Sequence, residues 1–321
     1  MIENDNKPSS IYQVKICRFS GAKRLRVKLN IFFFLLVGAV SMACNGAKPK
    51  VPAGDFVRAI GNQVYFVNFE KNKDELFYSF PVGTVIEQKI SQIDERTILL
   101  SLQGGGIVTV DLISGNAKNI GKGMNPVYMD KHQKIVYYGR DKDGKGALLI
   151  ANEKLEHPHR IVGYNRHDIP KVVKISSEEI VFQRGEPVPG SDMWQSKVWK
   201  YNIVSKELVK LDAIVDCRLV NVWRSKTNEL ICEKNTSDRF DTYYYFVDLL
   251  GGNEIRIDID GYLNVGEYIE DIDSIIIQKV NVKGGVEGYD LWLYDLSNNS
   301  QHIIMENSGF AIDSFLHLDR N

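Results

Sequence analysis

Three histidines lie close together in the middle of the chain and could bind zinc together. His157 and His159 flank a proline, and His167 follows eight residues later. Imidazole nitrogens are common zinc ligands, but a structural zinc site needs four ligands in a tetrahedron. Neither a nearby cysteine nor a histidine spaced along one strand face completes such a set. The pattern therefore favours solvated loop histidines, and we predict no metal site.

The segment Asp141–Gly146, with the sequence Asp-Lys-Asp-Gly-Lys-Gly, resembles the start of a calcium-binding loop. Such a loop needs an acid at its twelfth position, where this chain has Asn152. Asp-Gly between two apolar runs is also a hairpin signal. Gly104–Gly106 is a second glycine-rich turn, and no helix pattern follows it to cradle a phosphate. Both segments therefore predict hairpin turns, and we predict no cofactor.

Acidic residues gather before the strands of the last repeat. They are Asp258 and Asp260, and then Glu270, Asp271 and Asp273. Paired carboxylates can cleave glycosidic bonds, which would suit a hydrolase or lyase acting on polysaccharide. The alternative is that these acidic residues lie at loop ends only because charged side chains there keep the protein soluble. The sequence has no Gly-x-Ser-x-Gly nucleophile elbow. It therefore favours a protein without catalytic activity, and an enzyme is the alternative.

Two loops carry side chains suited to binding a partner. The first holds Met193 and Trp194 beside two prolines, and the second holds Arg239, Phe240 and Tyr243. Large apolar and arginine side chains on loops of a rigid scaffold are typical of protein-binding sites. The alternative is that these aromatic residues pack between structural repeats.

Two of the four cysteines, Cys217 and Cys232, lie in the body of the chain. An even pair can form a disulfide in an oxidising compartment. The alternative is a pair of buried core thiols.

The N-terminal region has the order of residues found in an export signal. Four basic residues between Lys23 and Lys28 precede the apolar run Ile31–Val40, and small residues follow. Counted to Ala43, the stretch from Ile31 is 13 residues long, whereas a helix needs about 20 to span a bilayer. Because positive charge stays on the cytoplasmic side, we expect everything after residue 44 to cross the membrane.

The end of this segment, Ser41-Met42-Ala43-Cys44, resembles a bacterial lipobox. That resemblance implies that Cys44 receives acyl chains such as palmitate and becomes the N-terminus of a membrane-anchored lipoprotein. Cleavage by an ordinary signal peptidase and an uncleaved anchor stay open. The Gly- and Pro-containing segment Asn45–Gly54 predicts a short tether between the anchor and the folded body.

The charge of the chain is unevenly distributed. Residues 1–44 hold seven Lys and Arg against two acids, which leaves 33 basic and 39 acidic residues and a net charge of −6 from Asn45 onward. Sequence-independent binding to nucleic acid needs a basic stripe, so we predict no nucleic-acid partner.

The elements that position these residues form a repeat of short β-rich runs separated by turns. Six copies begin with the runs Val64–Val67, Ile98–Leu100, Ile135–Tyr138, Ile180–Phe182, Leu230–Cys232 and Ile275–Ile277. A second run follows each, as in Leu76–Tyr78 or Leu291–Tyr294, and most copies then turn at an Asp or Asn. Those side chains favour turns because they accept hydrogen bonds from the backbone two residues on. In the first copy we expect Pro81–Gly83 to be that turn.

Six copies of this pattern predict an all-β fold, a β-propeller of six four-stranded antiparallel blades over residues 55–321, with seven blades possible. The strand ending in Leu291-Trp-Leu-Tyr-Asp-Leu296 resembles the repeats of TolB-like propellers, a family that includes the propeller of prolyl oligopeptidases. The Ser-Pro-Asp-Gly turn of those repeats is absent, so the resemblance implies the fold and no functional residue. We expect Gly309–Leu318 to close the ring against the first blade or to begin a seventh.

Together these features predict an extracytoplasmic propeller, anchored by lipid in the cell envelope, that binds or scaffolds a protein partner. Immunity against a toxin acting in the envelope is one version of that role. The polysaccharide hydrolase or lyase is the alternative.

Overall fold

The computed structural model describes residues 55–69, 71, 73–165, 171–215, 217–235, 242–250, 253–257, 263–283, 286–306 and 314–318. The chain divides into two units, Met1–Pro49 and Lys50–Asn321. All described residues belong to the second unit. The predictions about the export segment, Cys44 and the tether therefore lie outside the described residues.

The described residues form six four-stranded antiparallel sheets, which confirms the predicted six-bladed propeller. Each blade, from its innermost to its outermost strand, is made as follows. Blade 1 contains β24 (Ser314–Leu318), β1 (Asp55–Ile60), β2 (Gln63–Asn68) and β3 (Lys73–Ser79); blade 2 contains β4 (Ile86–Asp94), β5 (Thr97–Leu102), β6 (Gly106–Asp111) and β7 (Ala117–Lys122); blade 3 contains β8 (Met124–Met129), β9 (Lys134–Arg140), β10 (Gly146–Asn152) and β11 (His159–Gly163).

The second half of the ring repeats this order. Blade 4 contains β12 (Val172–Lys174), β13 (Glu179–Pro187), β14 (Trp194–Asn202) and β15 (Leu208–Lys210); blade 5 contains β16 (Arg218–Arg224), β17 (Glu229–Asn235), β18 (Thr242–Asp248) and β19 (Glu254–Ile257); blade 6 contains β20 (Leu263–Ile269), β21 (Ser274–Lys283), β22 (Val286–Asp295) and β23 (Ser300–Met305). Two short 3₁₀ turns, η1 (Asp130–His132) and η2 (Glu270–Ile272), follow β8 and β20.

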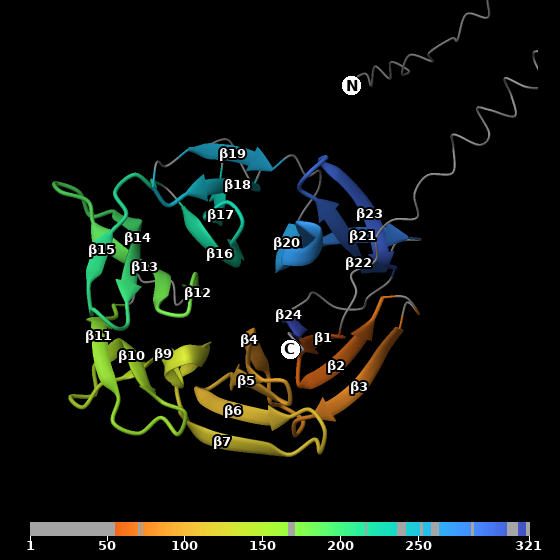
Figure 1. The fold of residues 1–321 in the computed structure, drawn as a ribbon, viewed down its shortest axis with the longest axis horizontal. Helices are drawn as coiled ribbons and strands as arrows, with labels where there is room; N and C mark the ends of the chain where they lie inside the picture. The colour runs from red at the N-terminus through yellow and green to blue at the C-terminus, as the bar shows by residue number, and fades with distance from the viewer. Residues whose placement is uncertain are drawn as a thin grey trace, which may run out of the picture. The chain divides into compact units, whose positions relative to one another are not determined.

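The ring is closed by the C-terminal strand. β24 pairs with β1 in antiparallel register, with Val57 opposite Leu316, and it contacts β4 and β20 on its two sides. Figure 1 shows β24 and β4 near the centre of the ring, with β3 and β7 at its edge. The tail therefore closes the first blade, as one of the two predicted alternatives requires. Because β24 is the innermost strand of blade 1, the pairing of β24 with β1 joins the two ends of the propeller.

This closure corrects the predicted alignment of the first repeat. Val64–Val67 lies in β2, which is the third strand of its blade, whereas Ile98–Leu100 lies in the second strand of blade 2. Pro81–Gly83 consequently lies in the connection between blades 1 and 2 and not inside a blade. The prediction assigned the runs of blade 1 to strands one position too far inward, because the innermost strand of blade 1 comes from the other end of the sequence.

The core lies between neighbouring blades. In β5, Ile98 and Leu100 pack against blade 1, while Leu99 packs with Ile135 and Leu149 of blade 3. A strand in the middle of a blade is covered on both faces, so its apolar residues run continuously and do not alternate with polar ones. The run Ile275–Ile277 of β21 follows the same rule between blades 5 and 1.

The predicted turns between the third and fourth strands are held by side chains. The carboxylate of Asp111 accepts hydrogen bonds from the backbone N–H of Ser114 and Ile113, at 2.7 and 3.0 Å. These backbone bonds lower the pKa of Asp111. Asn202 and Asp295 accept equivalent bonds in blades 4 and 6. This confirms the reason for Asp or Asn at that position.

Candidate functional site

A cavity of about 580 Å³ lies where the innermost strands of all six blades end. Every blade contributes lining residues to it, from Ile90 of blade 2 to Leu316 of blade 1. The strands β4, β8, β12, β16 and β20 contribute residues at or just beyond their carboxyl ends. We call this cavity the channel mouth, because the innermost strands surround the middle of the ring (Figure 1).

Three aromatic side chains line the channel mouth from equivalent positions. Tyr128, Trp223 and Tyr268 stand opposite the first apolar residue of the next strand, which is Ile135, Leu230 and Ile275 respectively. Each aromatic residue also precedes a left-handed turn residue by five positions. The ring geometry therefore brings together three residues that lie far apart in the chain.

These three aromatic residues were not among the sites predicted from the sequence. The signal that could have found them is an aromatic residue seven positions before the first apolar residue of the second strand, as in blades 3, 5 and 6. The same position in blade 4 is occupied by Lys174, which stands opposite Ile180 and also lines the channel mouth.

The channel mouth is strongly acidic. Among the residues that the structure describes, its lining includes five carboxylates and one lysine, Lys174. The Lys174 ammonium lies 2.5 Å from the Asp130 carboxylate and bridges blades 4 and 3. Partial burial opposes ionisation of Asp130, but the hydrogen bond and charge of Lys174 outweigh it and lower its pKa. The other four carboxylates of the lining belong to Asp94, Glu95, Glu267 and Glu270.

An ion-pair network beside the channel mouth joins blades 5 and 6. The Arg224 guanidinium donates to both oxygens of Asp273, at 2.9 and 2.6 Å, and to Glu229 at 3.0 Å. The Tyr268 hydroxyl donates to Asp273 at 2.9 Å. The hydrogen bonds from Arg224 hold the pKa of Asp273 below its usual value, while burial is the main cause that raises the pKa of Tyr268.

The predicted acidic residues lie in different surroundings. Asp273 is held in the ion pair with Arg224, and Glu270 lines the channel mouth. Asp271 is exposed. Asp258 and Asp260 lie outside the described residues. The structure therefore places one of the predicted acids at the cavity and gives a second one a structural partner.

The first predicted binding loop is the tip of the β13–β14 hairpin. Pro187 pairs with Trp194, and the Val188 N–H donates to the Met193 carbonyl at 2.9 Å across the turn. Gly190 provides the positive φ of 74° that this turn requires. Met193 and Trp194 are 67% and 43% exposed at the tip.

The second predicted binding loop is described only at its end. Arg239 and Phe240 lie outside the described residues. Tyr243 is half-buried, its ring centroid lies 6.0 Å from that of Tyr245, and the Arg256 guanidinium lies 5.2 Å from its ring centroid. For Tyr243 this corresponds to the alternative of packing within the propeller.

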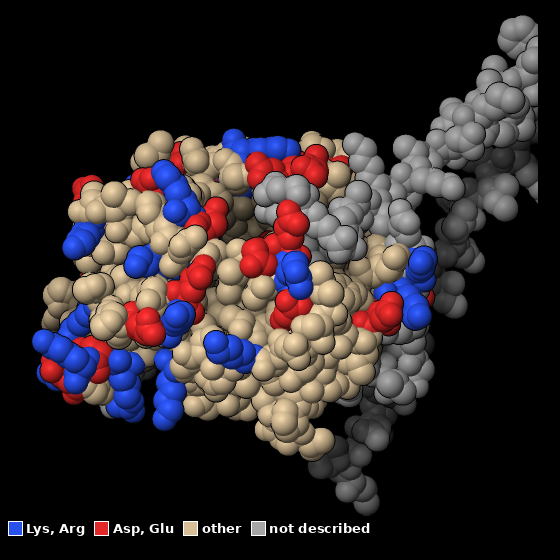
Figure 2. Space-filling view, turned by 60° about the horizontal axis from the view of Figure 1, so that its bottom comes forward, with Lys and Arg blue, Asp and Glu red and all other residues tan. Residues whose placement is uncertain are grey.

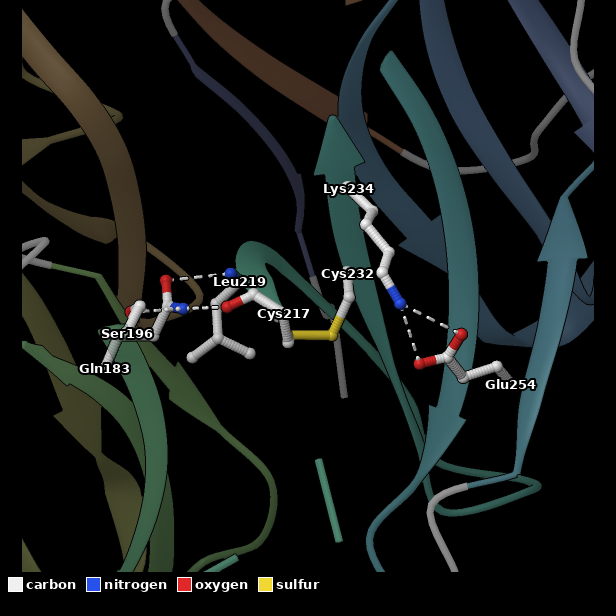
Figure 3. The surroundings of a disulfide bond; sticks show 7 residues. All are labelled: Gln183, Ser196, Cys217, Leu219, Cys232, Lys234 and Glu254. Carbon is white, nitrogen blue, oxygen red and sulfur yellow. Dashed lines mark hydrogen bonds and ion pairs between the residues drawn. A yellow bond between two sulfur atoms is a disulfide. The ribbon is translucent and has the colours of Figure 1, made fainter. Parts of the chain in front are cut away.

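Cys217 and Cys232 are joined by a disulfide with Cα atoms 5.1 Å apart, and both are buried (Figure 3). The side chain of Gln183 lies beside it and links blade 4 to blade 5. Its amide nitrogen donates to the Cys217 carbonyl and, at 3.0 Å, to the Ser196 hydroxyl; its oxygen accepts from the Leu219 N–H at 2.8 Å. Two of these bonds fix the start of β16 against blade 4, and the third holds the Gln183 amide within blade 4.

The histidine and calcium-loop segments form local structure. His157 and His159 are exposed, and His167 lies outside the described residues. The Asp141 carboxylate accepts from the N–H groups of Asp143 and Lys145 and pairs with Arg160 at 3.1 Å. Within the part of the chain that the structure describes, no three His, Cys, Asp or Glu side chains group to hold a metal ion.

The surface of the propeller carries mixed charge. Lys and Arg side chains are interspersed with Asp and Glu over the face seen in Figure 2. Among the described residues, no helix is long and apolar enough to cross a membrane.

Known proteins resemble this chain in fold but not in sequence. No family model matches the chain, and no curated protein matches its sequence. A structure from a nidogen–laminin complex matches with a TM-score of 0.59 and 9% identity, over 81% of this chain and 97% of that one. A TolB structure from Agrobacterium tumefaciens matches with a TM-score of 0.56 and 11% identity, over 77% of this chain and 89% of that one.

A third structure, an oligogalacturonate lyase in complex with manganese, matches with a TM-score of 0.49 and 12% identity over 74% of this chain and 73% of that one. Identities this low show the fold alone. The resemblance to TolB-like propellers is thus confirmed at the level of the fold.

Proposed function

We propose that this chain is a non-catalytic binding module, anchored by lipid at Cys44 in a bacterial cell envelope, which holds a protein partner at the β13–β14 hairpin. The exposed pair Met193 and Trp194 at the hairpin tip carries this proposal. Large apolar side chains are costly to expose to water, and Trp and Met are enriched where proteins meet.

The hairpin is built to present that tip rigidly. β13 and β14 pair over nine positions, from Glu179 opposite Asn202 to Pro187 opposite Trp194. By comparison, the β5–β6 hairpin pairs over six. A rigid support lowers the entropy cost of binding, because the contact residues are already ordered before the partner arrives.

Two features support the cellular setting. The residue order from Lys23 to Cys44 resembles that of an export signal ending in a lipobox. The Cys217–Cys232 disulfide is typical of proteins that mature in an oxidising compartment. Immunity against an envelope toxin is one version of the role, and it requires that the bound partner be a toxin whose activity falls on binding.

A photoreactive side chain placed at Met193 of the full chain, in living cells, tests this proposal. We expect it to crosslink to one protein. The matched control is the same group at Leu76, which is 51% exposed on β3 of blade 1. Trp194→Ser should weaken recovery of that partner by about tenfold or more, since a central Trp at an interface is worth about 2 kcal/mol. Equal crosslinking from both positions, or recovery that Trp194→Ser does not change, would refute the proposal.

A further inference from the structure

We propose that the channel mouth is a second binding site, which takes an organic cation carrying primary ammonium or guanidinium groups. This site is separate from the β13–β14 hairpin tip. It lies where β4, β8, β12, β16 and β20 end, and its volume of about 580 Å³ falls within the range of small-molecule sites, roughly 300–1,000 Å³.

The aromatic residues provide faces for a cation. The hydroxyl of Tyr128 already donates to Glu153, and that of Tyr268 already donates to Asp273. Tyr128 and Tyr268 are 6% and 9% exposed, so each offers a ligand only a small part of its aromatic ring. Trp223 adds a half-buried indole from the equivalent position of blade 5. A cation over the face of Trp or Tyr is attracted by the ring quadrupole, and the attraction grows when water is excluded.

The charge of the lining selects the sign of the ligand. Among the described lining residues, five carboxylates and one ammonium, that of Lys174, give a net charge of −4 when all are ionised. Lys174 is paired with Asp130. Outside the lining, the Lys226 ammonium bonds the backbone carbonyl of Glu270 at 2.5 Å. A concave surface of one sign attracts ligands of the opposite sign and repels anions such as acidic sugars and phosphates.

The position of the carboxylates favours an extended cation. Asp94 and Glu95 come from blade 2, Asp130 from blade 3, and Glu267 and Glu270 from blade 6. Blades 3 and 6 are separated by two blades on each side of the ring. A ligand with two or more positive groups can therefore reach carboxylates of different blades while its hydrocarbon chain lies against the aromatic rings.

Calorimetric titration of the full chain with spermidine at low salt tests the proposal. We expect saturable binding that weakens with added salt but persists when MgCl₂ of equal charge concentration is present. Glu270→Gln should weaken binding about fivefold or more. Trp223→Leu should do the same, and Trp223→Phe should restore most of the loss because it keeps an aromatic face. The matched control is Glu75→Gln, which removes an exposed carboxylate from β3 of blade 1.

A second titration uses an acetylated, amidated Lys-Gly-Lys-Gly-Lys peptide, which carries three ammonium groups as spermidine does, and it distinguishes a cation carried on a protein from a free amine. Tighter binding of the peptide assigns the site to a protein side chain, and tighter binding of spermidine assigns it to a free polyamine. Thermal unfolding of each variant separates loss of binding from loss of folding. Absence of saturable binding for both probes would overturn the proposal. An effect of Glu75→Gln equal to that of Glu270→Gln, or full displacement by MgCl₂, would also overturn it.

Discussion

Replacing Gln183 with leucine should destabilise the seam between blades 4 and 5. The Gln183 side chain is fully buried and satisfies the Leu219 N–H and the Cys217 carbonyl. Leucine has a similar volume, so the substitution removes the hydrogen bonds without opening a large cavity. Each buried backbone group left without its partner costs about 1–3 kcal/mol. With two such groups, and a small gain from the apolar side chain, we expect a loss of about 3 kcal/mol.

Urea unfolding with the disulfide intact measures this loss as a change in the free energy of unfolding. The control is Gln103→Leu, which alters an exposed glutamine in the β5–β6 turn and should change stability by about 0.5 kcal/mol or less. Amide hydrogen exchange adds a local readout, because the Leu219 N–H should exchange faster in Gln183→Leu. A loss below about 0.5 kcal/mol, or unchanged exchange at Leu219, would show that this amide does not hold the seam.

Three further predictions follow from the same contacts and from the export segment. The double change Cys217→Ala and Cys232→Ala should cost about 3 kcal/mol, because the disulfide closes a loop with a sequence separation of 15, and the variant should unfold identically with and without reductant. Asp273→Asn should cost about 2 kcal/mol at pH 7 by breaking the pair with Arg224. The pKa of Asp273 is lowered in the folded state, so its contribution to the free energy of unfolding is present above the unfolded pKa of about 4. That contribution is lost as the pH falls through the folded pKa. Denaturation curves of wild type and Asp273→Asn should therefore converge in acid. Cys44→Ser should move the propeller from the membrane fraction to the soluble fraction, and unchanged membrane retention would indicate an uncleaved helix instead of a lipid anchor.

Most of the fold could be predicted from local sequence. Runs such as Ile98–Leu100 and Ile275–Ile277 specify strands buried on both faces. Asp111 and Asn202 specify turns between the third and fourth strands of their blades. These signals depend on neighbouring residues only. The blade count therefore came directly from counting the repeats.

The alignment of blade 1 could not be predicted in the same way. Its innermost strand is β24, about 260 residues away along the chain from β1. Local patterns carry no information about which distant strand completes a sheet, since pairing depends on how the ring closes.

The sequence by itself determined the six repeats, the acidic balance of the body and the apolar residues Met193 and Trp194 in an extended loop, and it carries the residue order from which we predict an export segment. Only the tertiary structure decided that Cys217 meets Cys232 and that the innermost strands of six blades end around one cavity. Tyr128, Trp223 and Tyr268 are ordinary strand residues in the sequence, separated by 95 and 45 positions. They line one site because six blades arranged around a common centre bring the same position of each repeat to the same end of the channel.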